Sequence, residues 1–229
     1  MLAALERIAK RAYSSLETVQ ASYDIACAAI RNGIPGDFVE CGVGAGANAA
    51  AMALAIMDPA HYWNENKRNA ETLKQAWPPR RVHLFDSFTG IPQAGAEDVE
   101  FLAAGHKAGL TAHSRKEVER AFTEWGLPLE LFVFHEGMFA RQVPFATGSH
   151  FLTGEEAAHK IAHIEKIAVL RLDGDLYEST KVCIERLYPL VSKGGWIIVD
   201  DWDLSGARKA VLDYMGHGFG PVYWSKTNV

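Results

Sequence analysis

The sequence predicts an α/β fold in which helices cover both faces of a mostly parallel sheet, with residues 1–229 forming a single domain. Two observations predict this fold class. Short apolar runs that end in an acidic residue alternate along the chain with segments of helical periodicity. In addition, 229 residues with 48% hydrophobic and 22% charged side chains suit one globular domain.

The first half of the chain predicts a helix, a strand, a glycine turn and a second helix. Apolar side chains spaced by three and four residues predict an N-terminal helical segment within residues 1–33. Residues 37–41 predict a strand that opens directly into three glycines, and the alanine-rich stretch 47–57 predicts a helix. This order is the first half of a βαβ unit, and residues 82–86 predict its second strand.

The second half continues the alternation. Ser114, with Glu117 three residues on, predicts a helix that begins with a capping box. A helix after residue 173 has an apolar stripe that reaches Leu190 and Val191, and another helix is expected over residues 206–215. Four more strands are predicted, at residues 131–134, 167–172, 196–199 and 222–224.

Two connecting segments are predicted to be irregular. Lys193 to Gly195 predicts a turn. Residues 139–153 contain a proline, a glycine and a serine and predict an irregular loop. Because long loops in compact domains usually have a function, we expect this loop to be functional or mobile.

Composition excludes several classes of protein. A net charge of -5 and a pI near 6.0 argue against a general nucleic-acid binder. The longest apolar stretch, residues 47–57, is too short to span a bilayer, and the N-terminus has no signal-peptide core. Three scattered cysteines predict buried, reduced thiols rather than a disulfide framework, so we expect a cytoplasmic protein without membrane partners.

Acidic residues follow nearly every predicted strand. The carboxyl edge of an open α/β sheet is where ligands bind. Carboxylates gathered there would repel one another unless a cation or a hydroxyl-rich ligand were bound. The acidic residues are Glu40, Asp86, Glu136, Asp173, Asp200 and Asp201.

The glycine turn is the first candidate binding site. Glu40 precedes glycines at positions 42, 44 and 46. Dinucleotide-binding folds space their glycines as G-x-G-x-x-G, so that a pyrophosphate can approach the helix. The spacing of Gly42, Gly44 and Gly46 differs from that pattern and is more typical of an S-adenosylmethionine-dependent methyltransferase. The alternative is a plain turn between a strand and a helix.

Asp86 is the second candidate, because it ends the second strand and would accept hydrogen bonds from two ribose hydroxyls. It lies farther from the glycines than the acid of a dinucleotide fold does, which disfavours a nicotinamide-dependent oxidoreductase. The alternative is that Asp86 and Ser87 together form a turn.

Two adjacent strand ends predict a metal site. Neighbouring parallel strands would place Asp173 near Asp200 and Asp201, and three close carboxylates need a counter-charge. Hard oxygen ligands select Mg²⁺ or a similar divalent cation. Asp175 follows two residues after Asp173 and is a further candidate for the site. The alternative is that Asp175 is only the N-cap of the next helix, with Glu178 as its capping-box partner.

The histidines show no metal-binding spacing. His159 and His163 are expected on the surface. His113, His135 and His150 are candidates for lining the cleft, although the sequence does not place them there.

At these residues the chain resembles the macrocin O-methyltransferase family. Specific similarity lies in VLRLDGDLYEST (residues 169–180) and GGWIIVDDW (194–202), with further matches at residues 35–43 and 85–92. The resemblance runs with gaps from about residue 15 to residue 225 and implies a Rossmann-like class I methyltransferase fold. This chain departs from the family pattern at Gly44, Ala45 and Met138. Compared with the family, residues 139–166 form a longer segment, which we expect to be an insertion that serves as a lid.

The resemblance also implies how S-adenosylmethionine would be bound. Glu40 and the turn from Gly42 to Gly46 would hold its methionine end. Asp86 and Ser87 would hold its ribose, and Gly137 would lie near the adenine.

It further implies a chemistry. Asp173, Asp200 and Asp201 would bind Mg²⁺, and Asp175 would be the general base for the hydroxyl group of a sugar. The alternatives are a catechol-like diol as acceptor, a nicotinamide-dependent oxidoreductase, and a cofactor-binding module without activity. A homodimer or a higher homo-oligomer is a reasonable expectation.

Overall fold

The computed structural model describes residues 1–58, 80–147, 163–216 and 223–224, and confirms the α/β fold class. The described strands all pair in parallel, in the order β3-β2-β1-β4-β5-β6. They are β1 (Asp37–Cys41), β2 (Val82–Asp86), β3 (Phe132–Glu136), β4 (Ile167–Leu172), β5 (Val191–Val199) and β6 (Tyr223–Trp224).

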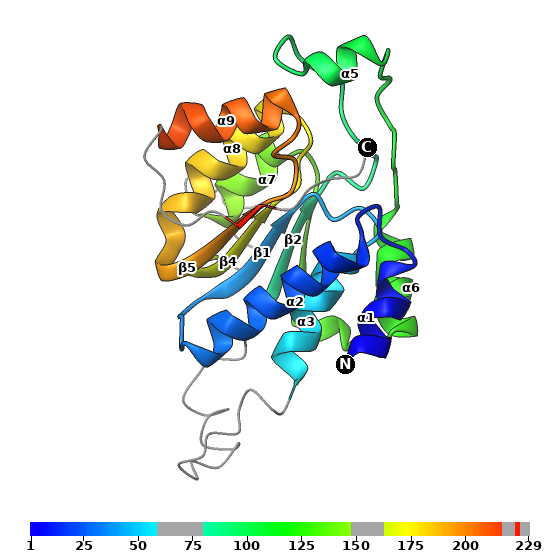
Figure 1. Cartoon of the computed structure of the whole chain (residues 1–229), viewed down its shortest axis with the longest axis vertical. Coiled ribbons are helices and arrows are strands. Elements are labelled where there is room, and N and C mark those ends of the chain that lie inside the picture. The colour runs from blue at the N-terminus through cyan, green and yellow to red at the C-terminus, as the bar shows by residue number, and fades with distance from the viewer. Residues whose placement is uncertain (59–79, 148–162, 217–222, 225–229) are drawn as a thin grey trace, which may run out of the picture.

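Helices cover both faces of this sheet (Figure 1). One face carries α2 (Leu16–Arg31) and α3 (Ala47–Met57), and the other carries α7 (Phe139–Ala146), α8 (Tyr177–Leu187) and α9 (Ser205–Met215). The remaining described helices are α1 (Leu2–Ala9), α5 (Val99–Ala103) and α6 (Arg115–Glu124), with 3-10 turns η2 (Leu129–Leu131) and η4 (Tyr188–Leu190). No helix among the described residues is long and apolar enough to cross a membrane.

Two hydrophobic clusters hold the layers together. Eight of the eleven residues of α3 are buried, because its alanines let α2 and the sheet approach its backbone closely. On the opposite face, α8 buries Cys183, Ile184 and Leu187 against the sheet. The three cysteines are free and buried, as the sequence predicts.

The register of the strands brings their carboxyl ends to one edge. Cys41 of β1 pairs with Leu172 of β4, and Leu172 pairs with Val199 of β5. The strand order reverses between β1 and β4, which is the point where α/β proteins bind ligands. The residues that follow these three strands are therefore level with one another.

The prediction of an irregular loop over residues 139–153 is wrong for the part that the structure describes, because residues 139–146 form α7. This helix forms despite Pro144 because Val143 and Ala146 are buried against neighbouring elements, and packing outweighs propensity. Most of the predicted lid, residues 148–162, lies outside the described residues, so a lid within 139–166 stays a prediction.

Two element boundaries also differ from the expectation. The helix α8 ends at Leu187, so Leu190 and Val191 are not part of it. The strand β5 begins at Val191 and includes the predicted turn. The turn survives as a bulge, because the pairing with β4 jumps from Val191 to Trp196 and Gly194 has a φ of 81°.

Three polar side chains form a buried chain across the first strands of the sheet. His83 Nε2 lies 3.2 Å from Asp37 Oδ2, and its Nδ1 lies 2.9 Å from His135 Nε2. Because a carboxylate only accepts, His83 donates to Asp37, and which histidine donates to the other depends on their tautomers. Burial, followed by the charge of His83, lowers the pKa of His135 to about 3.

This pKa makes stability depend on pH. In the unfolded chain His135 takes up a proton below about pH 6.5, whereas in the folded chain it stays neutral down to about pH 3. The contribution of His135 to the free energy of unfolding is therefore constant above that pH range and falls as the pH is lowered through it. Between pH 7 and pH 5 the contribution lost is about 2 kcal/mol. In urea unfolding, His135→Gln, whose side-chain amide can still hydrogen-bond to His83, should lose less stability over this range than the wild type. His163 is exposed, so His163→Gln should lose as much stability between pH 7 and pH 5 as the wild type. The same loss of stability in all three proteins would contradict the lowered pKa of His135.

Candidate active site

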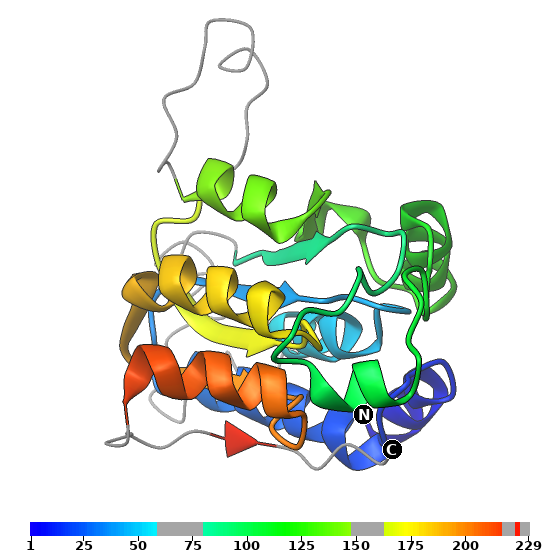
Figure 2. The ribbon, with the colours of Figure 1, turned by 90° about the horizontal axis from the view of Figure 1, so that it is seen from above.

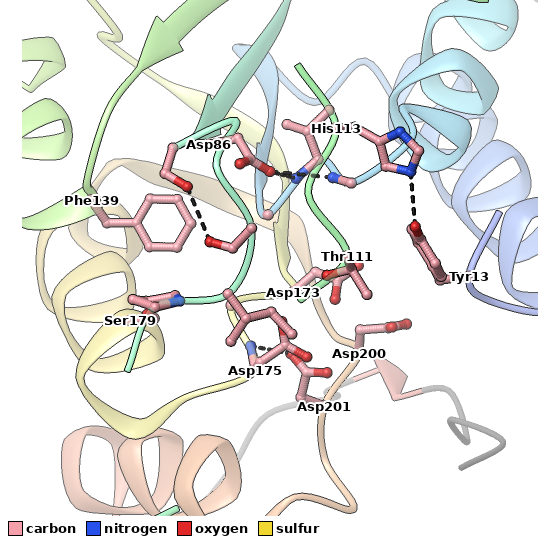
Figure 3. A pocket seen from close by; sticks show the side chains of 18 of the residues that line it. Tyr13, Asp86, Thr111, His113, Phe139, Asp173, Asp175, Ser179, Asp200 and Asp201 are labelled. Carbon is pink, nitrogen blue, oxygen red and sulfur yellow. Dashed lines mark hydrogen bonds between the residues drawn. The ribbon is translucent and has the colours of Figure 1, made fainter. Parts of the chain in front are cut away.

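A cavity of about 530 Å³ lies at the carboxyl edge of the sheet, a size typical of small-molecule sites (Figure 3). Most of the residues predicted for the site line it. They are Gly42, Gly44, Asp86, Ser87, Gly137, Asp173, Asp175, Asp200 and Asp201. Glu40 and Gly46 do not belong to its wall.

The glycine turn is shaped first by packing. A Cβ atom on Gly42, whose φ is 92°, would lie 1.6 Å from the carbonyl oxygen of Asp173. A Cβ atom on Gly46 would lie 2.8 Å from Phe122 of α6. Gly42 therefore lets the ends of β1 and β4 approach each other, and Gly46 lets α6 pack against the start of α3.

Asp86 both faces the cavity and holds the turn. Its Oδ2 accepts hydrogen bonds from the backbone N–H groups of Val43 (2.7 Å) and Gly44 (3.2 Å). Its Oδ1 accepts from Phe88 N at 2.7 Å, and Ser87 Oγ donates to Gly90 O. The turn expected as the alternative is thus present, and the ribose-binding role of Asp86 stays a prediction.

The predicted acidic cluster comes together. Asp173, Asp200 and Asp201 each offer an oxygen that lies within 4.8 Å of the others. Asp173 follows β4 and the other two follow β5, and the backbone hydrogen bond from Asp200 N to Leu172 O keeps the two loops level. Figure 3 shows these carboxylates beside Asp175 on one side of the cavity.

Arg171 is a buried cation beneath this cluster. Its role was not predicted from the sequence. Its side chain is fully buried on β4. Its Nη2 lies 2.9 Å from Asp173 Oδ2 and 2.8 Å from Asp200 Oδ1, and its Nε lies 3.2 Å from Glu40 Oε1. A charged residue within an otherwise apolar strand was the signal that could have revealed it.

The pKa values indicate that the cluster needs further positive charge. Burial raises the pKa of Glu40 to about 8, although Arg171 opposes this effect. Burial and then neighbouring carboxylates raise the pKa of Asp175 to about 8 and the pKa values of Asp173 and Asp201 well above their usual range. One arginine therefore does not neutralise the acidic groups gathered around it.

Asp175 is not a helix cap, so that alternative is wrong. Helix α8 begins at Tyr177, and its N-cap residue is Leu176, whose apolar side chain accepts no hydrogen bond. Asp175 itself has a φ of 59°, a conformation uncommon outside glycine. Its N–H donates to Asp201 Oδ2 at 2.8 Å, which ties the loop after β4 to the loop after β5.

The opposite rim contains residues that the sequence did not single out as a pair. The hydroxyl of Tyr13 lies 2.9 Å from His113 Nε2, and both residues line the cavity (Figure 3). His113 thus lines the cleft, whereas His135 is buried against Phe85. His163 is exposed, as expected, and His150 and His159 lie outside the described residues.

The fold and this site together define a Rossmann-like α/β protein whose ligand cavity adjoins a carboxylate site suited to a hard cation. The model of the family described as Macrocin-O-methyltransferase (TylF) matches residues 14–218. The chain therefore belongs to the macrocin O-methyltransferase family, as the resemblance implied.

The relatives that the chain matches are named as O-methyltransferases. The chain is 32% identical over 191 residues to the 8-demethyl-8-(2,3-dimethoxy-alpha-L-rhamnosyl)-tetracenomycin-C 4'-O-methyltransferase of Streptomyces olivaceus, covering 82% of this chain and 60% of that protein. It is also 32% identical over 212 residues to the demethyldecarbamoylnovobiocin O-methyltransferase of Streptomyces niveus, covering 86% and 69%. The chain thus spans about three fifths of the length of the first of these proteins.

Solved structures confirm the class I methyltransferase fold. The O-methyltransferase NovP matches with a TM-score of 0.67 at 32% identity, over 87% of this chain and 71% of that one. The calicheamicin methyltransferase CalS11 matches with a TM-score of 0.61 over 86% and 70%. At 23% identity, the second match supports the fold alone.

Replacing Arg171 by Met should destabilise the metal-free protein by about 3 kcal/mol or more, because it leaves buried carboxylates without their cation. Urea unfolding in the presence of a chelator measures this. Arg120→Met removes an exposed cation and should change stability by less than about 0.5 kcal/mol. A metal-free Arg171→Met protein as stable as the wild type would show that Arg171 does not hold the cluster together.

Proposed function

We propose that this protein is an O-methyltransferase that depends on S-adenosylmethionine and a divalent metal and acts on a hydroxyl group of a sugar or a glycosylated small molecule. One observation carries the proposal: the carboxylates of Asp173, Asp200 and Asp201 converge at the cavity that the glycine turn also lines. Membership of the macrocin O-methyltransferase family supports it.

The residues at the glycine turn fit S-adenosylmethionine. The backbone of Gly42 and Gly44, the carboxylate of Asp86 and the backbone of Gly137 all line one cavity. Glu40 lies beneath that cavity, and its Oε2 is buried without a hydrogen-bond partner among the described residues. Glu40 would therefore support the methionine end from beneath, through its hydrogen bond from Arg171, rather than from the cavity wall.

The donor set also fits a hard divalent cation such as Mg²⁺. Its members are all carboxylates, and their oxygens are close enough to surround one ion. The raised pKa values of Asp173 and Asp201 show that the metal-free arrangement disfavours their charged forms. A second cation beside Arg171 would relieve this repulsion.

The chemistry follows from these positions. When bound, the cation would orient an acceptor oxygen and lower its pKa, and S-adenosylmethionine would supply the methyl group. Asp175 lines the cavity beside the cluster, and we assign it to accept the proton of the hydroxyl group. Burial and the neighbouring carboxylates raise its pKa to about 8 in the metal-free form, and a bound cation would lower this pKa and leave the carboxylate able to accept a proton.

The acceptor is proposed from the names of the relatives. One acts on a rhamnosyl-bearing tetracenomycin, and another is a mycinamicin III 3''-O-methyltransferase from Micromonospora griseorubida, 29% identical over 214 residues. We therefore place the reacting hydroxyl group on a sugar. A catechol-like diol would satisfy the same cation, and the cytoplasmic location and the homo-oligomer stay predictions.

Mass spectrometry tests the reaction directly. The protein is incubated with S-adenosylmethionine, Mg²⁺ and each of four acceptors: demethyldecarbamoylnovobiocin, mycinamicin III, the rhamnosyl tetracenomycin and catechol. Addition of one methyl group to a sugar-bearing acceptor, abolished by a chelator, is expected. Methylation of catechol alone would favour the diol, and chelator-resistant methylation would remove the metal from the mechanism.

Two substitutions should separate the base from the metal site. Asp175→Asn should lower kcat by about a hundredfold or more, because the proton acceptor is lost, while Mn²⁺ affinity changes by less than about threefold. Asp200→Asn should weaken Mn²⁺ binding by at least about tenfold. Calorimetry with Mn²⁺ measures the affinities, and the exposed Asp203→Asn is the matched control. Loss of Mn²⁺ affinity in Asp175→Asn would make Asp175 a ligand instead of a base.

A further inference from the structure

The two helices that follow the metal-binding loops begin without caps of their own. The N-cap residue is Leu176 for α8 and Leu204 for α9, and neither supplies a side-chain hydrogen bond. The first N–H groups of a helix have no partner within it and need an external acceptor. Helix α8 begins two residues after Asp175, and α9 begins four residues after Asp201.

The segment between β2 and α6 supplies both acceptors. This segment, residues 87–113, is closed at its base by backbone hydrogen bonds between Ile91 and the strand-like pair Gly109 and Leu110. Its helix α5 lies against α9, as Figure 2 shows. The same segment lines the cavity with Ile91, Pro92 and Thr111, among others.

Asp98 serves the start of α8. Its side chain is 2% exposed, and its Oδ1 accepts the N–H of Tyr177 at 2.7 Å across 79 positions of sequence. Its Oδ2 accepts the N–H of Gly95 at 2.8 Å, which fixes the carboxylate within its own segment. A Cβ atom on Gly206 of α9 would lie 2.0 Å from Asp98 Oδ1, so the glycine leaves the space that this carboxylate fills.

Glu100 serves the start of α9. Both of its carboxylate oxygens lie 3.2 Å from Ser205 N, and its Oε2 lies 2.7 Å from Ser205 Oγ. The hydrogen bond from the Ser205 side chain lowers the pKa of Glu100 below its ordinary value, because it favours the charged form. An anion at the start of a helix also interacts favourably with the helix dipole.

We propose that Asp98 and Glu100 are positioning residues for the metal-dependent reaction: from outside the two metal-binding loops, they fix the helix starts that hold Asp173, Asp175, Asp200 and Asp201 in place. This inference rests on the proposed function. Tyr177 is two residues from Asp175, and the Asp175 N–H is bonded to Asp201. A shift at the start of α8 therefore changes both loops together.

The test compares Mn²⁺ affinity, kcat, KM for S-adenosylmethionine and urea stability in four variants. Asp98→Ala removes one cap, and Glu100→Gln weakens the other. Gly206→Ala displaces the Asp98 carboxylate sterically and leaves every charge in place. Glu97→Gln removes the same charge as Glu100→Gln from the same segment without removing a cap, and is the matched control.

We expect Asp98→Ala and Gly206→Ala to weaken Mn²⁺ binding by about tenfold and to lower kcat, with little change in the KM for S-adenosylmethionine. Glu100→Gln should show a smaller effect in the same direction, and Glu97→Gln should behave as the wild type. Because Glu100 is exposed, Glu100→Gln keeps the test valid if Asp98→Ala or the sterically crowded Gly206→Ala does not fold.

Wild-type Mn²⁺ affinity in the variants, with only urea stability reduced, would overturn the positioning role and leave the proposed function intact. Absence of Mn²⁺ binding by the wild-type protein would instead overturn the metal site, and the positioning role with it.

Discussion

The charge of Arg171 at the centre of a fully buried strand is the constraint on which the site depends. Glu40 of β1, Asp173 after β4 and Asp200 after β5 meet around this side chain. Without a cation there, the charged form of each carboxylate would be disfavoured. Because Arg171 cannot lose its proton at physiological pH, it provides a fixed positive charge before any ligand arrives. It leaves the acidic groups short of full neutralisation, and the proposed metal would complete the balance.

Around this centre, the strand order brings the two proposed binding sites to one edge of the sheet. The reversal between β1 and β4 places the glycine turn directly beside the loop of Asp173, and Gly42 allows their backbones to meet. A methyl donor held at the turn and an acceptor held at the carboxylates would therefore share one cavity. Glu40 and Asp173 also share Arg171, so the floor of the proposed cofactor site and the metal site are parts of one ionic network.

The sequence predicted the strand ends well because apolar runs that stop at acidic residues identify both a buried strand and its polar edge. It placed Asp173, Asp200 and Asp201 together for that reason. It missed α7 because Pro144 is a poor helix former and only tertiary burial stabilises the helix. The cap supplied by Asp98 could not be predicted, since its partner lies 79 residues away and no local pattern links them.

The central claim is that a divalent cation binds between the loops after β4 and β5, above Arg171. The most direct measurement is the anomalous diffraction of crystals grown with Mn²⁺ and the product S-adenosylhomocysteine. We expect one strong peak coordinated by Asp173, Asp200 and Asp201, with Asp175 outside the coordination sphere and facing the acceptor space. A peak elsewhere, or no peak at these carboxylates at saturating Mn²⁺, would contradict it.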